Sequence, residues 1–172
     1  CSGGITEDAQ AVWGTDYPYL KSVVSPGEEH ASVYTDMAFF TFQQFQNCLG
    51  ISLCGNPSEW IGAVTYTPGN GVDRMMIGGR EFTGTQLRSL LGLRSTNFSV
   101  ELTEEGLEII TKGYGHRVGM SQYGADAMAE SGSDFARILA HYYPGTVLQQ
   151  LPLTEEAPAD IMQETTEGEL EP

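Results

Sequence analysis

Basic residues are scarce in this chain of 172 residues. Eight lysines and arginines face 23 aspartates and glutamates, so the formal net charge is −15 at pH 7. Binding to nucleic acid depends on neutralising phosphates with Lys and Arg, and attraction to anionic membranes depends on the same side chains. The charge balance therefore argues against nucleic acid as a partner and disfavours anionic membrane surfaces.

Long apolar runs are also missing. No stretch approaches the roughly 20 residues that a membrane-spanning helix needs, and the opening CSGGITEDAQ lacks the basic and apolar regions of a signal peptide. The first residues, Cys-Ser-Gly-Gly, resemble the middle of a loop, so we expect a domain cut from a longer protein. Hydrophobic residues make up 40% of the chain, which is a globular composition.

Cysteine is rare, and Cys1, Cys48 and Cys54 form neither a C-x-x-C motif nor a pattern with paired histidines. We therefore expect no metal site and no cofactor. Cys48 and Cys54 would pair in an oxidising compartment. A small buried thiol at Cys48, on a helix ending near Gly50, is the interpretation that we favour.

The patterns that are present predict an α+β fold, with antiparallel hairpins and short packed helices. Two helices, 41–50 and 83–92, each open on a capping box, Thr41 with Gln44 and Thr83 with Gln86. The predicted strands flank two glycine-containing turns, 68–71 and 104–106. These strands span residues 60–67, 72–77, 97–102 and 107–111.

Periodicity refines this prediction. Phe98, Val100 and Leu102 alternate with polar residues, which predicts one buried face in that strand. Two further helices follow, the first from Ser121 to a stop at 132 and the second capped by Ser133. We place the folded domain at 1–151 and a flexible acidic tail at 152–172, where no basic residue occurs.

The run Gly113–Ala125, GYGHRVGMSQYGA, gathers polar groups at a strand-to-helix junction. Tyr114, His116, Ser121 and Gln122 are neutral donors and acceptors that suit the hydroxyl and amide groups of a sugar. The same residues have a structural interpretation, in which the glycines shape a turn, Ser121 caps a helix and the histidine is simply hydrogen-bonded.

Three stretches of the chain resemble one family: SGGITEDAQAVWGTDYPYLKSVVSPGE (2–28), TGTQLRSLLGLRSTNFSV (83–100) and GYGHRVGMSQYGADAMAESGSDFARILAHYYPGT (113–146). They are similar to segments of stage II sporulation protein D and the amidase enhancer LytB. The resemblance implies a lytic transglycosylase that acts on peptidoglycan glycan strands during engulfment. The alternative is a noncatalytic glycan-binding or amidase-enhancing module that kept the cleft wall and lost the acid.

The resemblance also implies site residues. It carries over to Ser2, Gly3 and Gly4 in the first loop, to Tyr19 in a P-Y-L tripeptide, and to Tyr114, His116, Ser121 and Gln122. We expect these side chains to bind substrate, with His116 orienting the sugar or a glutamate. Arg117 stands where many relatives have glycine.

The catalytic acid is expected elsewhere, because the family's glutamate segment has no counterpart here and would lie upstream of Cys1. Glu7, Asp8 and Glu28 are candidates to face the cleft and replace that glutamate, but we favour their interpretation as acids of a helix start, a loop or the surface. Trp13 is a candidate for stacking on sugar rings, whereas Trp60 and Tyr143 are expected to pack in the core.

The expected partners are peptidoglycan glycan strands and other sporulation proteins or envelope hydrolases. The expected location is extracytoplasmic, at the cell envelope, with a membrane anchor in a segment that precedes Cys1.

Overall fold

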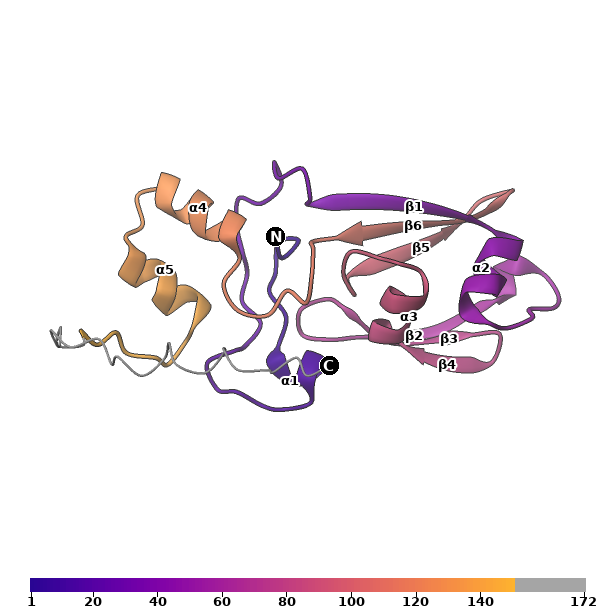
Figure 1. Ribbon diagram of the computed structural model, residues 1–172, viewed down its shortest axis with the longest axis horizontal. Helices are drawn as coiled ribbons and strands as arrows, with labels where there is room; N and C mark the ends of the chain where they lie inside the picture. Colours follow the sequence, from indigo (N-terminus) through magenta and orange to yellow (C-terminus); the bar gives the residue numbers. More distant parts are fainter. Residues whose placement is uncertain (151–172) are drawn as a thin grey trace, which may run out of the picture.

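The computed structural model describes residues 1–150, so the acidic tail predicted at 152–172 lies outside the described residues. The described part is α+β, as the sequence predicts (Figure 1). Its elements are α1 (Ala9–Trp13), β1 (Thr35–Thr41), α2 (Phe42–Leu49), a 3-10 turn (Pro57–Glu59), β2 (Ile61–Tyr66), β3 (Val72–Ile77), β4 (Arg80–Thr83), α3 (Gly84–Leu90), β5 (Phe98–Leu102), β6 (Gly106–Lys112), α4 (Gln122–Glu130) and α5 (Phe135–Tyr142).

The strands form two antiparallel sheets of three strands each, in the orders β1-β6-β5 and β2-β3-β4. Both predicted hairpins are present, β2 with β3 and β5 with β6. In the second hairpin Phe98 faces Thr111 and Leu102 faces Leu107. The first strand of the chain, β1, pairs with β6 far along the sequence, with Thr35 opposite Lys112.

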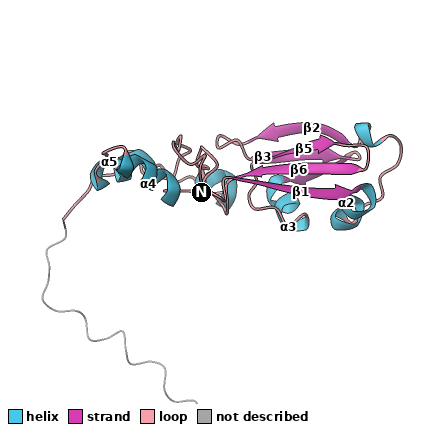
Figure 2. Ribbon diagram, turned by 90° about the horizontal axis from the view of Figure 1, so that it is seen from above, coloured by secondary structure: helices cyan, strands magenta, loops and turns pink. Residues whose placement is uncertain are grey.

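The hydrophobic core lies between the two sheets and under α2 and α3. Each of these helices directly follows a β-strand and begins with the predicted capping box. The side chains of Thr41 and Thr83 accept a hydrogen bond from the backbone amide of the third residue of each helix. Figure 2 shows the strands gathered at one end of the elongated molecule, with α4 and α5 at the other. The buried core side chains are Phe45, Leu49, Val72, Met75, Ile77, Phe82, Leu87, Leu91, Leu93, Phe98, Leu107 and Ile109.

Several details differ from the sequence-based predictions. Strands β1 and β4 were not predicted, because their apolar residues point to both sides of the sheet or are too few. Leu102 is 47% exposed, since it is the last residue of β5 and lies beside the hairpin turn, outside the core. The cap of α5 is Asp134 rather than Ser133, because the Asp134 carboxylate accepts from the amide of Arg137.

Cys48 lies on α2, partly buried, and Cys54 is exposed in the following loop. Both are free thiols, which agrees with the interpretation of Cys48 as an unpaired thiol on a helix. No helix in the part of the chain that the structure describes is long and apolar enough to cross a membrane.

The N-terminal segment lies between the sheets and the α4–α5 pair (Figure 1). It is held there by backbone hydrogen bonds, from Glu7 to Arg117 and from Tyr114 to Cys1, both 2.8 Å long. The first loop and the run Gly113–Ala125 are therefore neighbours, although more than 100 positions separate the bonded residues. This contact builds the candidate site.

Candidate functional site

A polar pocket of about 270 Å³ opens where the first loop meets the run Gly113–Ala125. Five of the predicted site residues line it: Ser2, Tyr114, His116, Ser121 and Gln122. The prediction that these residues form one wall of a cleft requires that the two distant segments lie side by side, and they do. The remaining lining residues are Cys1, Gly115, Arg117, Val118, Gly119 and Met120.

The other three predicted residues, Gly3, Gly4 and Tyr19, do not line this pocket. Gly4 donates its backbone amide to the Glu28 carboxylate. Gly3 supports the wall from behind, because its backbone passes so close to β6 that a Cβ atom would lie 2.8 Å from the amide nitrogen of Gly113. Tyr19 lines a separate, more apolar groove beside α5 with Leu139 and Tyr143. Their predicted contact with substrate stays a prediction.

His116 projects from the pocket wall in a defined orientation. Its Nδ1 accepts a hydrogen bond of 2.9 Å from the amide of Val118, so the neutral ring carries its proton on Nε2. The ring packs against Trp13, with centroids 5.4 Å apart. Because Trp13 is 52% exposed, the pair presents an aromatic surface beside a hydrogen-bond donor, a combination that suits a sugar ring.

Glu28 is buried behind this wall and acts as its anchor. Its carboxylate accepts from the amides of Ser2 and Gly4, at 3.0 Å and 2.9 Å, and from the Ser2 hydroxyl at 2.9 Å. The hydroxyls of Ser25 and Ser121 also donate to it. Burial alone would raise the pKa of Glu28, but the hydrogen bonds from Ser121, Gly4 and Ser2 outweigh it and lower the pKa.

The Glu28 cluster extends to the last two helices. The hydroxyl of Tyr142 on α5 lies 2.6 Å from that of Ser25, and the side chain of Ser121 caps α4 through the amide of Gly124. A Cβ atom on Gly124 would overlap both Ser25 and Tyr142. One carboxylate thus fixes the first loop, the start of α4 and the face of α5 relative to one another.

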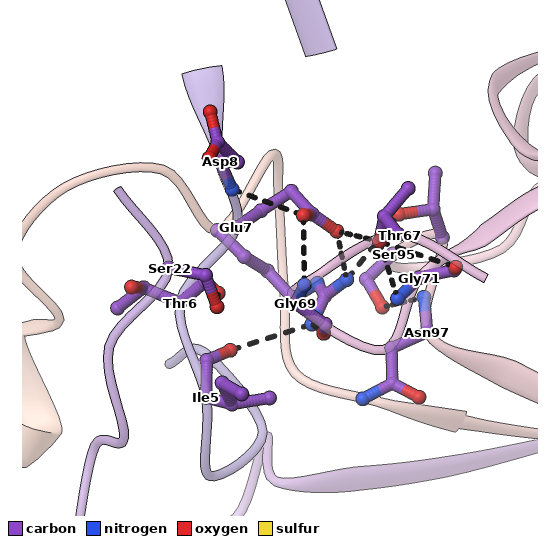
Figure 3. Close-up of polar contacts among 12 residues, drawn as sticks. Ile5, Thr6, Glu7, Asp8, Ser22, Thr67, Gly69, Gly71, Ser95 and Asn97 are labelled. Carbon is purple, nitrogen blue, oxygen red and sulfur yellow. Dashed lines mark hydrogen bonds and ion pairs between the residues drawn. The ribbon is translucent and has the colours of Figure 1, made fainter. Parts of the chain in front are cut away.

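A second buried acid, Glu7, pairs with Arg117 at 3.0 Å, and both side chains are almost fully buried. Figure 3 shows Glu7 facing the turn that joins β2 to β3, where it accepts from the hydroxyl of Thr67 at 2.6 Å and the amide of Gly69 at 3.1 Å. Arg117 donates to the carbonyl of Gly69 at 2.8 Å. The pair therefore attaches the pocket wall to the β2–β3 turn.

The surface or loop interpretation is wrong for both Glu7 and Glu28, which are 1% and 0% exposed. Asp8 does start a helix, as the cap of α1. Apart from Ser25, the partners of Glu7 and Glu28 are backbone amides and side chains far along the chain, so local sequence carries little signal of their burial. The adjacent small residues Ser2, Gly3 and Gly4 are the only hint of a backbone nest.

Arg117 also explains the departure from the family pattern at that position. It has a positive φ of 62°, a left-handed conformation that favours glycine. Its guanidinium donates to Glu7 and to backbone carbonyls, although its Nε has no partner among the described residues. The buried ion pair holds the residue in that conformation.

The side chains that line the pocket are neutral or basic. None of the described residues that line it is an acid. Glu28 has a lowered pKa and is saturated with donors, so it is ionised near neutral pH and cannot donate a proton. No group of three or more His, Cys, Asp or Glu within residues 1–150 is placed to hold a metal ion.

Trp60 and Tyr143, which were expected to pack in the core, differ in how far they are buried. Trp60 is 6% exposed and its indole donates to the carbonyl of Cys54, so it packs as predicted. Tyr143 is half-buried, with its hydroxyl 3.4 Å from the amide of Met120 at the pocket edge. The fold and this wall together define an α+β protein with a polar, aromatic-rimmed pocket at a strand-to-helix junction.

Comparison with known proteins confirms the family resemblance. The chain is 41% identical over 150 residues to stage II sporulation protein D of Bacillus amyloliquefaciens and 40% identical to that of Bacillus subtilis strain 168. Each match covers 87% of this chain and 43% of the relative. The chain is thus a relative of stage II sporulation protein D, and it spans less than half the length of these proteins.

A shorter match links the chain to a second protein. It is 46% identical over 67 residues to the amidase enhancer of Bacillus subtilis strain 168, a match that covers 37% of this chain and 10% of the relative. No family model matches the chain. The names of these relatives connect them with sporulation and with the enhancement of an amidase.

Proposed function

We propose that the chain binds peptidoglycan glycan strands through the pocket at the run Gly113–Ala125. The carrying observation is the convergence of Ser2, Tyr114, His116, Ser121 and Gln122 on one polar pocket beside exposed Trp13. Neutral donors and acceptors next to an aromatic face are what a sugar needs for its hydroxyls, its acetamido group and its apolar ring face. The proposed location of this activity is the cell envelope.

We further propose that this wall serves a lytic transglycosylase, whose acid comes from outside the described residues. In that reaction a carboxylic acid protonates the glycosidic oxygen as the bond to C1 breaks. The resulting carboxylate then takes the proton from the sugar's own six-hydroxyl, which closes the 1,6-anhydro ring without water. The neutral groups of the pocket would hold the sugar and orient it while charge develops at C1.

A second candidate function is favoured by the absence of an acid among the described lining residues and by the match to the amidase enhancer. In this case the chain is a noncatalytic module that binds glycan and promotes the action of an envelope hydrolase. The glycan-binding step is common to both candidates, so it can be tested first.

The binding test uses co-sedimentation of the full 172-residue chain with purified peptide-free glycan strands. His116→Ala should weaken binding about five- to tenfold, the value of one or two hydrogen bonds. His30→Ala is the matched control, because His30 is exposed elsewhere on the surface. Equal binding by all three proteins would overturn the proposed site.

The catalytic test compares the chain with a version extended upstream of Cys1 by a family glutamate segment. Mass spectrometry should detect 1,6-anhydro-muramic ends only with the extended protein, and a Glu→Gln change in the added segment should abolish them. If the extended protein binds glycan but releases no anhydro ends, the noncatalytic module is the correct function. Release by the unextended chain would contradict an external acid.

A further inference from the structure

A second pocket, of about 330 Å³, lies between the β2–β3 turn and the outer face of β5 and β6. It shares no lining residue with the pocket at the run Gly113–Ala125. Neither the resemblance nor the comparisons assign a role to it. Its lining consists of Tyr66, Asn70, Asn97, Phe98, Ser99, Ile110 and Lys112.

The polar side chains of this pocket are not used by the fold. Within residues 1–150 the carboxamides of Asn70 and Asn97 and the hydroxyl of Ser99 make no hydrogen bond to protein. The backbone amides of Asn70 and Asn97 are satisfied, by the carbonyl of Thr67 and the hydroxyl of Ser95, each at 3.0 Å. In Figure 3 the Asn97 carboxamide points away from the network around Glu7. Side-chain amides offer both donors and acceptors, as a sugar's hydroxyl and acetamido groups require.

An aromatic ring and a cation complete the pocket. Tyr66, the last residue of β2, is 63% exposed and leaves a ring face open beside the amides. Lys112, the last residue of β6, makes no ion pair in the described chain and, unlike Arg80, Arg88 and Arg137, which also make none, it lines a pocket with unsatisfied polar side chains. The charge of this lysine is therefore free to pair with an anionic group of a ligand.

The pocket is presented on a rigid support. Asn70 has a positive φ of 60° and lies between Gly69 and Gly71, both buried against Glu7. A Cβ atom on Gly71 would lie 2.7 Å from the Glu7 carboxylate, and one on Gly69 would lie 2.6 Å from the carbonyl of Thr6. The buried Glu7–Arg117 pair therefore fixes the turn that carries Asn70, so little ordering is needed when a ligand binds.

We propose that this pocket is a second saccharide site, which takes an N-acetylated sugar that carries a carboxylate. Tyr66 packs on the apolar ring face, Asn70 and Asn97 bond the acetamido and hydroxyl groups, and Lys112 pairs with the carboxylate. This inference goes beyond the proposed function by adding a site on the other side of the Glu7–Arg117 pair, where a longer glycan or a separate sugar unit would be held.

The experiment is an NMR titration of the full chain with N-acetylmuramic acid, with N-acetylglucosamine as the uncharged sugar and acetate as the carboxylate alone. The acid sugar should shift the amide signals of Asn70, Asn97 and Ser99, and it should bind about fivefold more tightly than either partial probe, as one partly exposed ion pair allows. Lys112→Gln should remove that preference and Lys112→Arg should retain it.

Matched controls separate this site from the first. Arg137→Gln removes the same charge from the exposed face of α5 and should leave the titration unchanged. Shifts confined to Gly115 and His116 would support the proposed function and overturn the second site. Equal binding of acetate and the acid sugar, or a preference that survives Lys112→Gln, would also overturn it.

Discussion

Arg117 and Glu7 form a buried ion pair across 110 positions of sequence, with 3.0 Å between guanidinium nitrogen and carboxylate oxygen. Burial lowers the pKa of Arg117 and the adjacent Glu7 carboxylate raises it, with burial the larger effect. The attraction between the two charges therefore adds little net stability, whereas removal of one partner leaves the other charge buried and unpaired, which is costly.

Arg117→Met should destabilise the fold by about 3 kcal/mol, because it leaves the Glu7 carboxylate buried without a countercharge. Urea unfolding at pH 7 measures the loss. The control is Glu81→Gln, which breaks an exposed ion pair with Arg74 and should cost less than about 1 kcal/mol. Similar losses in the two variants would contradict the structural weight given to the buried pair.

The Glu28 cluster makes stability depend on pH. Because the folded-state pKa of Glu28 lies below its ordinary value of 4.5, the ionised carboxylate stabilises the fold at neutral pH. That contribution is lost as the pH falls through the folded-state pKa. Glu28→Gln should cost about 1–3 kcal/mol at pH 7, and the difference from the parent protein should shrink in acid.

Thermal melts of both proteins between neutral and acidic pH test this expectation. Glu29→Gln is the matched control, since Glu29 is exposed at the adjacent position, and its melting curve should follow that of the parent. A Glu28→Gln penalty that stays constant down to the lowest pH would show that the carboxylate's charge plays no part.

Gly124→Ala should destabilise the α4–α5 pair, because the added methyl group overlaps the Ser25 and Tyr142 hydroxyls. Overpacking of this kind typically costs about 1–3 kcal/mol. Hydrogen exchange of α5 amides should accelerate more than exchange in β6. Ala129→Ser, on the exposed side of the same helix, should change stability by less than about 0.5 kcal/mol; a comparable loss there would contradict the steric argument.

Trp13 should report glycan binding by fluorescence, since it is one of two tryptophans and the other, Trp60, is buried. In Trp60→Phe, peptide-free glycan should shift or quench the remaining emission as the exposed indole is covered. In Trp13→Phe, the signal from Trp60 should not respond. A response from Trp60 alone would place binding away from the His116 pocket.

Much of the fold was predictable because its signals are local. The capping boxes at Thr41 and Thr83 need only the next three residues, and both hairpins are marked by the glycines of their turns. The candidate site residues came from the family resemblance, and the structure brings Tyr114, His116, Ser121 and Gln122 of one short segment together with Ser2 of a distant one in a single pocket. Their role in binding stays a prediction.

The rest depended on distant partners. Strand β1 is defined by its pairing with β6. The cap of α5 is a local exception, because the Asp134 side chain accepts from the amide of Arg137, three residues on. Glu7 and Glu28 looked like ordinary acids of an acidic chain. Their burial follows from donors supplied by Arg117, Thr67 and Ser121, which no window of sequence around either glutamate contains.

Arg117 belongs to the wall of one pocket, and its guanidinium holds the turn that carries Asn70 into the other. A ligand that displaces Arg117 in the first pocket must therefore alter the energy of the second. By thermodynamic reciprocity the change in affinity is the same in both directions. If both proposed sites bind sugar, the buried pair would make their occupancy cooperative or antagonistic whenever binding moves that one side chain.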